Sequence, residues 1–209
     1  MDNKFNEKDS LQVINEMIAQ TRNNIQIGAA NPMIFCGYFV AIVAICNIIL
    51  LETLDKPYYS FWIWLLMIPM SLIERCFISR KKNKSAIVRT PIDRIISKIW
   101  IGFACCIVVL LISIFSLISI SDNWIFTILI TPVILTLTGF GQFISGYATR
   151  FAPFVRGAYV FWVGAVLAIT LAYGIFNSQT IQFIILAVCM IVGFVIPGHI
   201  LNRKAKENV

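Results

Sequence analysis

Three ionisable side chains lie in or beside apolar segments where they could do chemistry: Glu74, Arg75 and His199. An ionisable group inside a bilayer is costly and is by default a functional candidate, for proton transfer in particular. General acid–base catalysis has little to work with here, because the chain offers one histidine and no Asp/Glu pair in these segments. We therefore expect Glu74, Arg75, His199 and Arg203 to form a polar cluster that ties helix ends together, here called the helix-end cluster. Proton coupling is the alternative.

His199 stands in the sequence "FVIPGHILNRK", residues 194–204, directly after Pro197 and Gly198. Proline has no backbone N–H and clashes with the preceding turn, so it loosens or kinks a helix. We therefore expect carbonyl groups around Gly193 to lack their usual donors and to need partners from elsewhere.

Small polar residues of the segment 124–145 fall within about 60° of arc on a helical wheel. They are Thr127, Thr131, Thr138, Gln142 and Ser145, here called the polar stripe. Gly141 lies beside them, and Gly141-x-x-x-Ser145 is a pair of small residues that lets two helices approach closely. A packing seam is the favoured interpretation, because no second stripe of matching chemistry occurs on another apolar segment. The alternative is a polar lining for a conduction or substrate path.

Motifs for catalysis, cofactors or metals are missing from the sequence. It contains no GxSxG, HExxH or Walker A pattern. The six cysteines all fall in apolar segments, without a CxxC pair, which is typical of small packing residues. We expect no catalytic, cofactor-binding or metal-binding residue, and hence no enzyme.

These side chains must be positioned by membrane-spanning helices. Of the 209 residues, 59% are hydrophobic and only 13% are charged, which is more apolar surface than a soluble fold of this size can cover. Six apolar runs reach the roughly 20 residues that a bilayer requires. They are 32–51, 61–79, 100–120, 124–145, 157–176 and 181–201. The predicted fold class is all-α, a polytopic bundle of six transmembrane helices over residues 31–201.

The charges predict the orientation of this bundle. Sixteen of the 17 Lys and Arg residues fall on one side of the six predicted spans, and Lys56 alone falls on the other. Because cytoplasmic loops carry the excess of Lys and Arg, both termini are expected in the cytoplasm. The predicted location is the cytoplasmic (inner) membrane, with a basic loop at 80–98 and a basic tail at 202–209.

The N-terminal segment 1–30 is predicted to contain an amphipathic cytoplasmic helix. Its apolar side, the candidate partner face, is formed by Leu11, Ile14, Met17, Ile18 and Ile25. Helices that lie on lipid are usually rich in Lys and Arg, whereas the polar side here is mostly Gln and Asn, with Arg22 its only basic residue. Docking on protein is therefore favoured over lipid contact.

The basic loop leads into the third span. Thr90 can cap a helix, Pro91 suits the first helical position, and Asp93 complements the N-terminal dipole. We expect a helix to begin there and to continue into the membrane. Its charge is expected to attract anionic lipid head groups. Nucleic acid is not expected as a partner, because the loop lacks an interleaved aromatic platform.

Several stretches together resemble a group of uncharacterised bacterial six-span membrane proteins: "LQVINEMIAQTRNNI" with "NPMIFCGYFV", "RTPIDRIISKIW", "GFGQFISG" and "VIPGHILN". The similarity covers nearly the whole chain in order. Such proteins are often encoded beside a winged-helix transcription regulator. The resemblance implies a membrane accessory or sensor and carries over no catalytic residues.

Two functions follow as expectations. The first is a non-enzymatic integral membrane protein, an accessory or sensory component that engages a partner from the cytoplasmic side. The second is a small oligomeric channel or transporter that uses the polar stripe. The expected partners are the lipid bilayer and either another protein or further copies of this chain.

Overall fold

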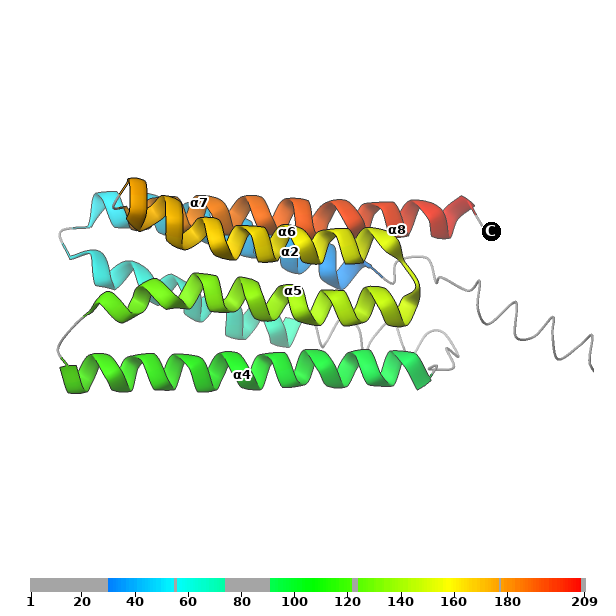
Figure 1. Cartoon of the computed structure of the whole chain (residues 1–209), viewed down its shortest axis with the longest axis horizontal. Coiled ribbons are helices and arrows are strands. Elements are labelled where there is room, and N and C mark those ends of the chain that lie inside the picture. Colours follow the sequence, from blue (N-terminus) through cyan, green and yellow to red (C-terminus); the bar gives the residue numbers. More distant parts are fainter. Residues whose placement is uncertain (1–29, 55, 74–90, 122–123, 177, 208–209) are drawn as a thin grey trace, which may run out of the picture.

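A computed structural model describes residues 30–54, 56–73, 91–121, 124–176 and 178–207 of the chain. In these ranges the secondary structure is helical, and the helices lie lengthwise beside one another (Figure 1). The elements in chain order are α2 Asn31–Thr53, η1 Pro57–Leu66, α4 Pro91–Ser121, η2 Trp124–Leu129, α5 Ile130–Thr149, α6 Ala152–Ile169, η3 Thr170–Ile175, α7 Gln179–Met190, η4 Ile191–Val195 and α8 Ile196–Glu207. The elements η1 and η2 are 3₁₀ helices, and η3 and η4 are π-helices.

Five helices are long and apolar enough to cross a membrane, which makes the chain a multi-pass membrane protein. They are Asn31–Thr53, Arg94–Ser121, Ile125–Thr149, Ala152–Ile175 and Gln179–Glu207. A further apolar helix, Tyr59–Ile73, is shorter. Residues 74–79 of the predicted second span lie outside the described residues, as do the segment 1–29 and the loop 80–90. The N-terminal amphipathic helix therefore stays a prediction.

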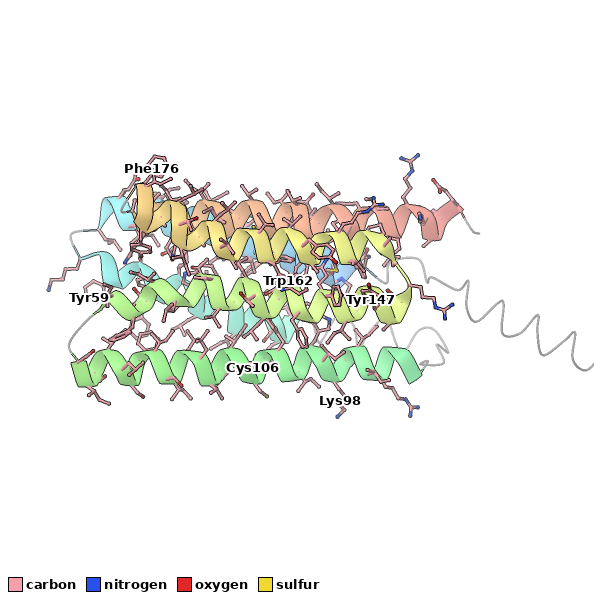
Figure 2. The ribbon with its side chains drawn as sticks, in the orientation of Figure 1. Tyr59, Lys98, Cys106, Tyr147, Trp162 and Phe176 are labelled. Atoms are coloured by element: carbon pink, nitrogen blue, oxygen red, sulfur yellow. The ribbon has the colours of Figure 1, made fainter. Side chains whose placement is uncertain are left out.

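The two ends of the bundle are distinct (Figure 1). One end, here called the terminal end, holds Ala30, the start of α4, the α5–α6 turn and the end of α8. The opposite end, here called the far end, holds the end of α2, the start of η1, the end of α4 and the α6–α7 turn. Tyr59 and Phe176 lie at the far end, and Lys98 lies near the terminal end (Figure 2).

Helix boundaries follow the predicted spans with two corrections. As expected, α4 begins at Pro91 and continues as one helix into the third span. The fifth span was predicted to begin at 157, but α6 begins at Ala152, with Pro153 in its first turn. Arg156 lies inside α6, where a long cationic side chain can remain in the helix and extend toward water. Likewise α8 continues to Glu207, past the end of the last apolar run.

Three prolines mark changes of helix type. Pro69 and Pro132 each lie two residues inside an α-helical stretch that follows a 3₁₀ helix, η1 or η2. Pro197 is the second residue of α8, which follows the π-helix η4. Because proline cannot donate to the carbonyl four residues earlier, the turn before it cannot stay a regular α-helix. Each change leaves backbone carbonyls that other groups must satisfy.

The core of the bundle is formed by α2, α5, α6, α7 and η4. Leu135 and Phe161 are fully buried in it, and the ring of Phe194 contacts Phe161 at 5.0 Å between centroids. Trp100 of α4 reaches the same core, 5.7 Å from Phe194. At the far end, Trp64 of η1 stacks on Phe183 of α7. The helix α4 otherwise lies at the edge: 11% of its apolar window is buried, against 56% in Gln179–Glu207.

Candidate functional site

The polar stripe faces the interior of the bundle. Thr127 lies in η2 and the other four residues lie in α5, and none is more than 7% exposed. Two of the hydroxyls donate to their own helix, Thr138 Oγ1 to the Ile134 carbonyl and Ser145 Oγ to the Gly141 carbonyl, both at 2.7 Å. At least two hydroxyls of the stripe are thus hydrogen-bonded to backbone carbonyls of α5 itself. The stripe presents small side chains to the neighbouring helices.

Gln142 of the polar stripe reaches another helix. Its Nε2 donates to the backbone carbonyl of Gly193 in η4, with 2.6 Å between the two atoms. Gly193 is four residues before Pro197, so its carbonyl is the one that the proline leaves without an α-helical donor. The expectation that carbonyls around Gly193 need a partner is confirmed, and the partner is the amide of the fourth span.

Two glycines make room for this amide. A Cβ atom on Gly157 of α6 would lie 2.5 Å from both Gln142 Nε2 and the Gly193 oxygen. A Cβ atom on Gly193 would lie 2.6 Å from the ring of Phe161. Only residues without a side chain permit this approach. Gln142, Gly157 and Gly193 thus join α5, α6 and η4 at one point, here called the first amide node.

Near the far end, another buried glutamine donates to a carbonyl that lies four residues before a proline, and this site is here called the second amide node. Gln182 of α7 is 3% exposed, and its Nε2 donates to the Ile128 carbonyl at 3.0 Å and to the Ala168 carbonyl at 3.2 Å. Ile128 is four residues before Pro132, just as Gly193 is four residues before Pro197. The sequence analysis did not single out Gln182. A proline inside an apolar helix leaves the carbonyl four residues earlier without its α-helical donor. Matching each such carbonyl with the Asn and Gln side chains of the other apolar segments could have pointed to Gln182.

The outward side of the α5–α6 pair is covered by aromatic rings. Trp162 of α6 lies across Gly139, where a Cβ atom would be 2.7 Å from its Nε1, and this indole nitrogen donates to the Thr136 carbonyl at 3.2 Å (Figure 2). Phe143 contacts Trp162, Tyr147 and Tyr159 with centroid distances of 4.7 to 6.3 Å. Tyr147 and Tyr159 remain more than half exposed. Exposed tyrosines at one end of a helix pair are typical of a membrane interface.

The helix-end cluster is only partly within the described residues. Glu74 and Arg75 lie outside them, so their contact with His199 stays a prediction. His199 lies on the exposed side of α8, where its Nε2 is 3.4 Å from the hydroxyl of Tyr38 in α2. Arg203 pairs with Glu207 one turn later at 3.1 Å, and both side chains are strongly exposed. A second contact between α8 and α2 joins Asn202 Nδ2 to Asn31 Oδ1 at 2.7 Å.

An apolar cluster closes the terminal end of the bundle. It consists of Ala30, Phe151, Phe154 and Leu201, here called the terminal-end cluster, with Met33 and Ile34 packed against it. The tight turn between α5 and α6 sets its position: Arg150 has a left-handed backbone with φ of 52°, and the Phe151 N–H donates to the Gly146 carbonyl. Lys204 of α8 lies 5.7 Å from the ring of Phe151, a cation–π contact. The cluster connects the start of α2 with α6 and α8.

Within the described ranges, no three His, Cys, Asp or Glu side chains converge to hold a metal ion. Cys46, Cys105, Cys106 and Cys189 are free thiols. The candidate partner face (Leu11, Ile14, Met17, Ile18 and Ile25) lies outside the described residues.

No family model, curated protein or solved structure matches this chain.

The site residues thus divide into two kinds. Gln142 and Gln182 hold helices together because their amides donate to backbone carbonyls that prolines leave without an α-helical donor. His199 and the terminal-end cluster join α8 to α2 at the end where the chain's N-terminal segment enters. Both arrangements join neighbouring helices.

Proposed function

We propose that the chain is a non-enzymatic protein of the cytoplasmic membrane, an accessory or sensory component that engages a protein partner through its cytoplasmic N-terminal segment. The observation that carries this proposal is the terminal-end cluster. Ala30, the residue that directly follows the segment 1–29, is 2% exposed and packs with residues of α6 and α8. A partner held by the segment 1–29 would therefore act on a buried joint of the bundle rather than on a free tail.

The distribution of charge supports a cytoplasmic terminal end. Seven described Lys and Arg residues belong to the parts of α4, the α5–α6 turn, α6 and α8 that are nearer the terminal end: Arg94, Lys98, Arg150, Arg156, Arg203, Lys204 and Lys206. Lys56 lies between α2 and η1, at the far end. Positive charge accumulates on the cytoplasmic side of membrane proteins, so we place both chain ends there.

The length of the second apolar segment supports six spans. The ten residues of η1 rise about 2.0 Å each, and the seven helical residues 67–73 rise about 1.5 Å each, which makes about 30 Å together. That length equals the thickness of a bilayer's hydrocarbon core. Because α2 ends at the far end and α4 starts at the terminal end, the chain between them returns along the bundle, which also supports a sixth crossing (Figure 1).

Photo-crosslinking in cells tests the proposed partner. A benzophenone amino acid replaces Ile14, on the candidate partner face, or Asn23, on the opposite side of the same predicted helix. We expect a discrete protein adduct from position 14 and at least about tenfold less from position 23, because a helix docked on protein buries one side. The adduct is then identified by mass spectrometry.

Equal crosslinking from both positions, or adducts with lipid alone, would contradict the proposal. The control for insertion is a chain that lacks residues 1–27, recovered from the membrane fraction in equal amount. This chain should lose the adduct partner in a pull-down while keeping its thermal unfolding in detergent.

The channel or transporter alternative depends on the polar stripe, and the described contacts do not favour it. Thr138, Gln142 and Ser145 all donate to backbone carbonyls, and Leu135 and Phe161 beside them are fully buried. A conducting path would need polar groups that turn to a water-filled space. Solute or ion flux into proteoliposomes that hold the wild-type chain would revive this alternative.

A further inference from the structure

Asn47 of α2 is a buried amide without a protein partner. Its exposed fraction is 0%, and neither Nδ2 nor Oδ1 has a hydrogen-bond partner among the described residues. It lies six residues before the end of α2 at Thr53, about 9 Å inside the far end of the bundle. A buried polar group without partners is expensive, and in a native structure it requires an explanation.

Two other buried amides differ from Asn47 in that their nitrogen has a partner, although the Oε1 of Gln142 is also buried without one among the described residues. Gln142 and Gln182 each donate to a carbonyl of another helix, at 2.6 Å and at 3.0 Å. Each of these carbonyls lies four residues before a proline and has therefore lost its α-helical N–H donor. In both cases a side-chain amide donates to it instead. The segment of α2 around Asn47 is regular helix without an internal proline. Among the described residues, the amide of Asn47 has no such carbonyl as a partner, either in its own helix or in another.

Several elements place a buried polar side chain in the far half of the interior, and an apolar layer lies one turn further inward. Among the described residues, five buried polar side chains from five elements belong to this half: Asn47 of α2, Ser60 of η1, Thr127 of η2, Thr131 of α5 and Gln182 of α7. One turn further inward, Ala44 and Leu135 are fully buried. Buried polar residues also continue along α5 toward the terminal end, as Thr138, Gln142 and Ser145, and the fully buried Leu135 lies between them and Thr131.

We propose that Asn47 binds water inside the bundle, and that this water enters from the far end. A buried water typically makes about three hydrogen bonds with polar groups that protein leaves unsatisfied, and the amide supplies both a donor and an acceptor. The apolar layer at Ala44 and Leu135 stops the water there. The site is independent of the proposed cytoplasmic partner, and it gives the molecule a solvated interior on the opposite side of the membrane.

Silver-ion reactivity of single cysteines tests this. In a chain whose six native cysteines are replaced by alanine or serine, Asn47→Cys is compared with two controls on the same helix. Ala44→Cys is equally buried but one turn deeper, and Ile49→Cys, at 57% exposed in the wild type, faces outward at a similar depth. Silver ions, which are small and hydrated, are added to each side of reconstituted vesicles in turn. The protein is then denatured, and the thiols that have not reacted are labelled with a maleimide and counted.

Only a thiol that water can reach ionises and reacts, so we expect Asn47→Cys to be blocked about tenfold faster than either control, from the far side alone. Equal, slow reaction of all three cysteines would overturn the proposal. So would faster reaction from the terminal side.

A second variant decides the question if the cysteine chain does not fold. In the proposed site, Asn47→Leu displaces water that other buried polar groups also use, so the midpoint of thermal unfolding in detergent should fall. If the amide is dry and unpaired, the same change removes an unsatisfied group and the midpoint should rise. A rise would overturn the proposal.

Discussion

At the scale of residues, the buried glutamines act as replacements for backbone donors that prolines remove. In the first amide node, Gln142→Leu would leave the Gly193 carbonyl buried without a donor. We expect this to lower the free energy of unfolding by about 1–3 kcal/mol. The measurement is reversible unfolding of the purified protein in mixed detergent micelles.

The proline provides the matched background for this variant. In a Pro197→Ala chain, residue 197 regains an N–H that can donate to the Gly193 carbonyl, so Gln142→Leu should cost less there. A coupling of about 1 kcal/mol or more between positions 142 and 197 is expected from the double-mutant cycle. If Gln142→Leu lowers the free energy of unfolding equally in both backgrounds, the amide does not replace the donor that Pro197 removes from the Gly193 carbonyl.

The two nodes also show what the sequence could predict at this scale. A free carbonyl near Gly193 follows from Pro197 by covalent geometry alone, and it was predicted. Gln142 was placed on the right face by helical periodicity, but its partner on another helix was not, because periodicity carries no information about which helices meet. Neither Gln182 nor Asn47 stands out in the sequence, since a single amide in an apolar segment makes no pattern.

At the scale of elements, glycines set how closely α5, α6 and η4 approach one another. Gly157→Ala would place a methyl group 2.5 Å from Gln142 Nε2 and from the Gly193 oxygen, both held by the node. We expect a loss of about 1–3 kcal/mol in the free energy of unfolding, because neither group can move without breaking the hydrogen bond.

Gly102→Ala is the control for helix propensity. No atom lies within 4 Å of a Cβ built on Gly102, which is in the middle part of the edge helix α4. This change should be neutral or should stabilise the protein by up to about 1 kcal/mol, because alanine favours a helix over glycine. If both substitutions cost the same, close approach at Gly157 is not what holds the three elements.

Periodicity predicted the elements better than their helix type. Apolar runs located the spans, and Pro91 located the start of α4, because both signals are local. The 3₁₀ and π segments were not predicted, apart from a loosening near Pro197. Pro69 and Pro132 alter the helical turn before them. Whether that turn becomes a 3₁₀ or a π segment depends on which neighbouring groups donate hydrogen bonds to its carbonyls, as Gln182 does to the Ile128 carbonyl.

At the scale of the whole molecule, the number of crossings decides which surfaces a partner can reach. Five crossings would put the two chain ends on opposite sides of the membrane, whereas six put them on the same side. The described segment from Pro57 to residue 73 has the length of a crossing, about 30 Å, although only its last seven residues are α-helical. This length supports our proposal of six spans.

Side-specific labelling of single cysteines distinguishes the two topologies. In the cysteine-free chain, Asn83→Cys in the basic loop and Val209→Cys at the C-terminus should both be protected from a membrane-impermeant maleimide added outside intact cells. Lys56→Cys should react, because the positive-inside rule places the α2–η1 connection outside. If residues 61–79 do not cross, Asn83→Cys and Lys56→Cys share one side and react alike. That result would remove the sixth span and, since the remaining crossings would be odd in number, would place Ala30 and the end of α8 on opposite sides of the membrane. Ala30 packs with Leu201 in the terminal-end cluster, and this contact supports our proposal of six spans, because residues on opposite sides of a bilayer cannot touch.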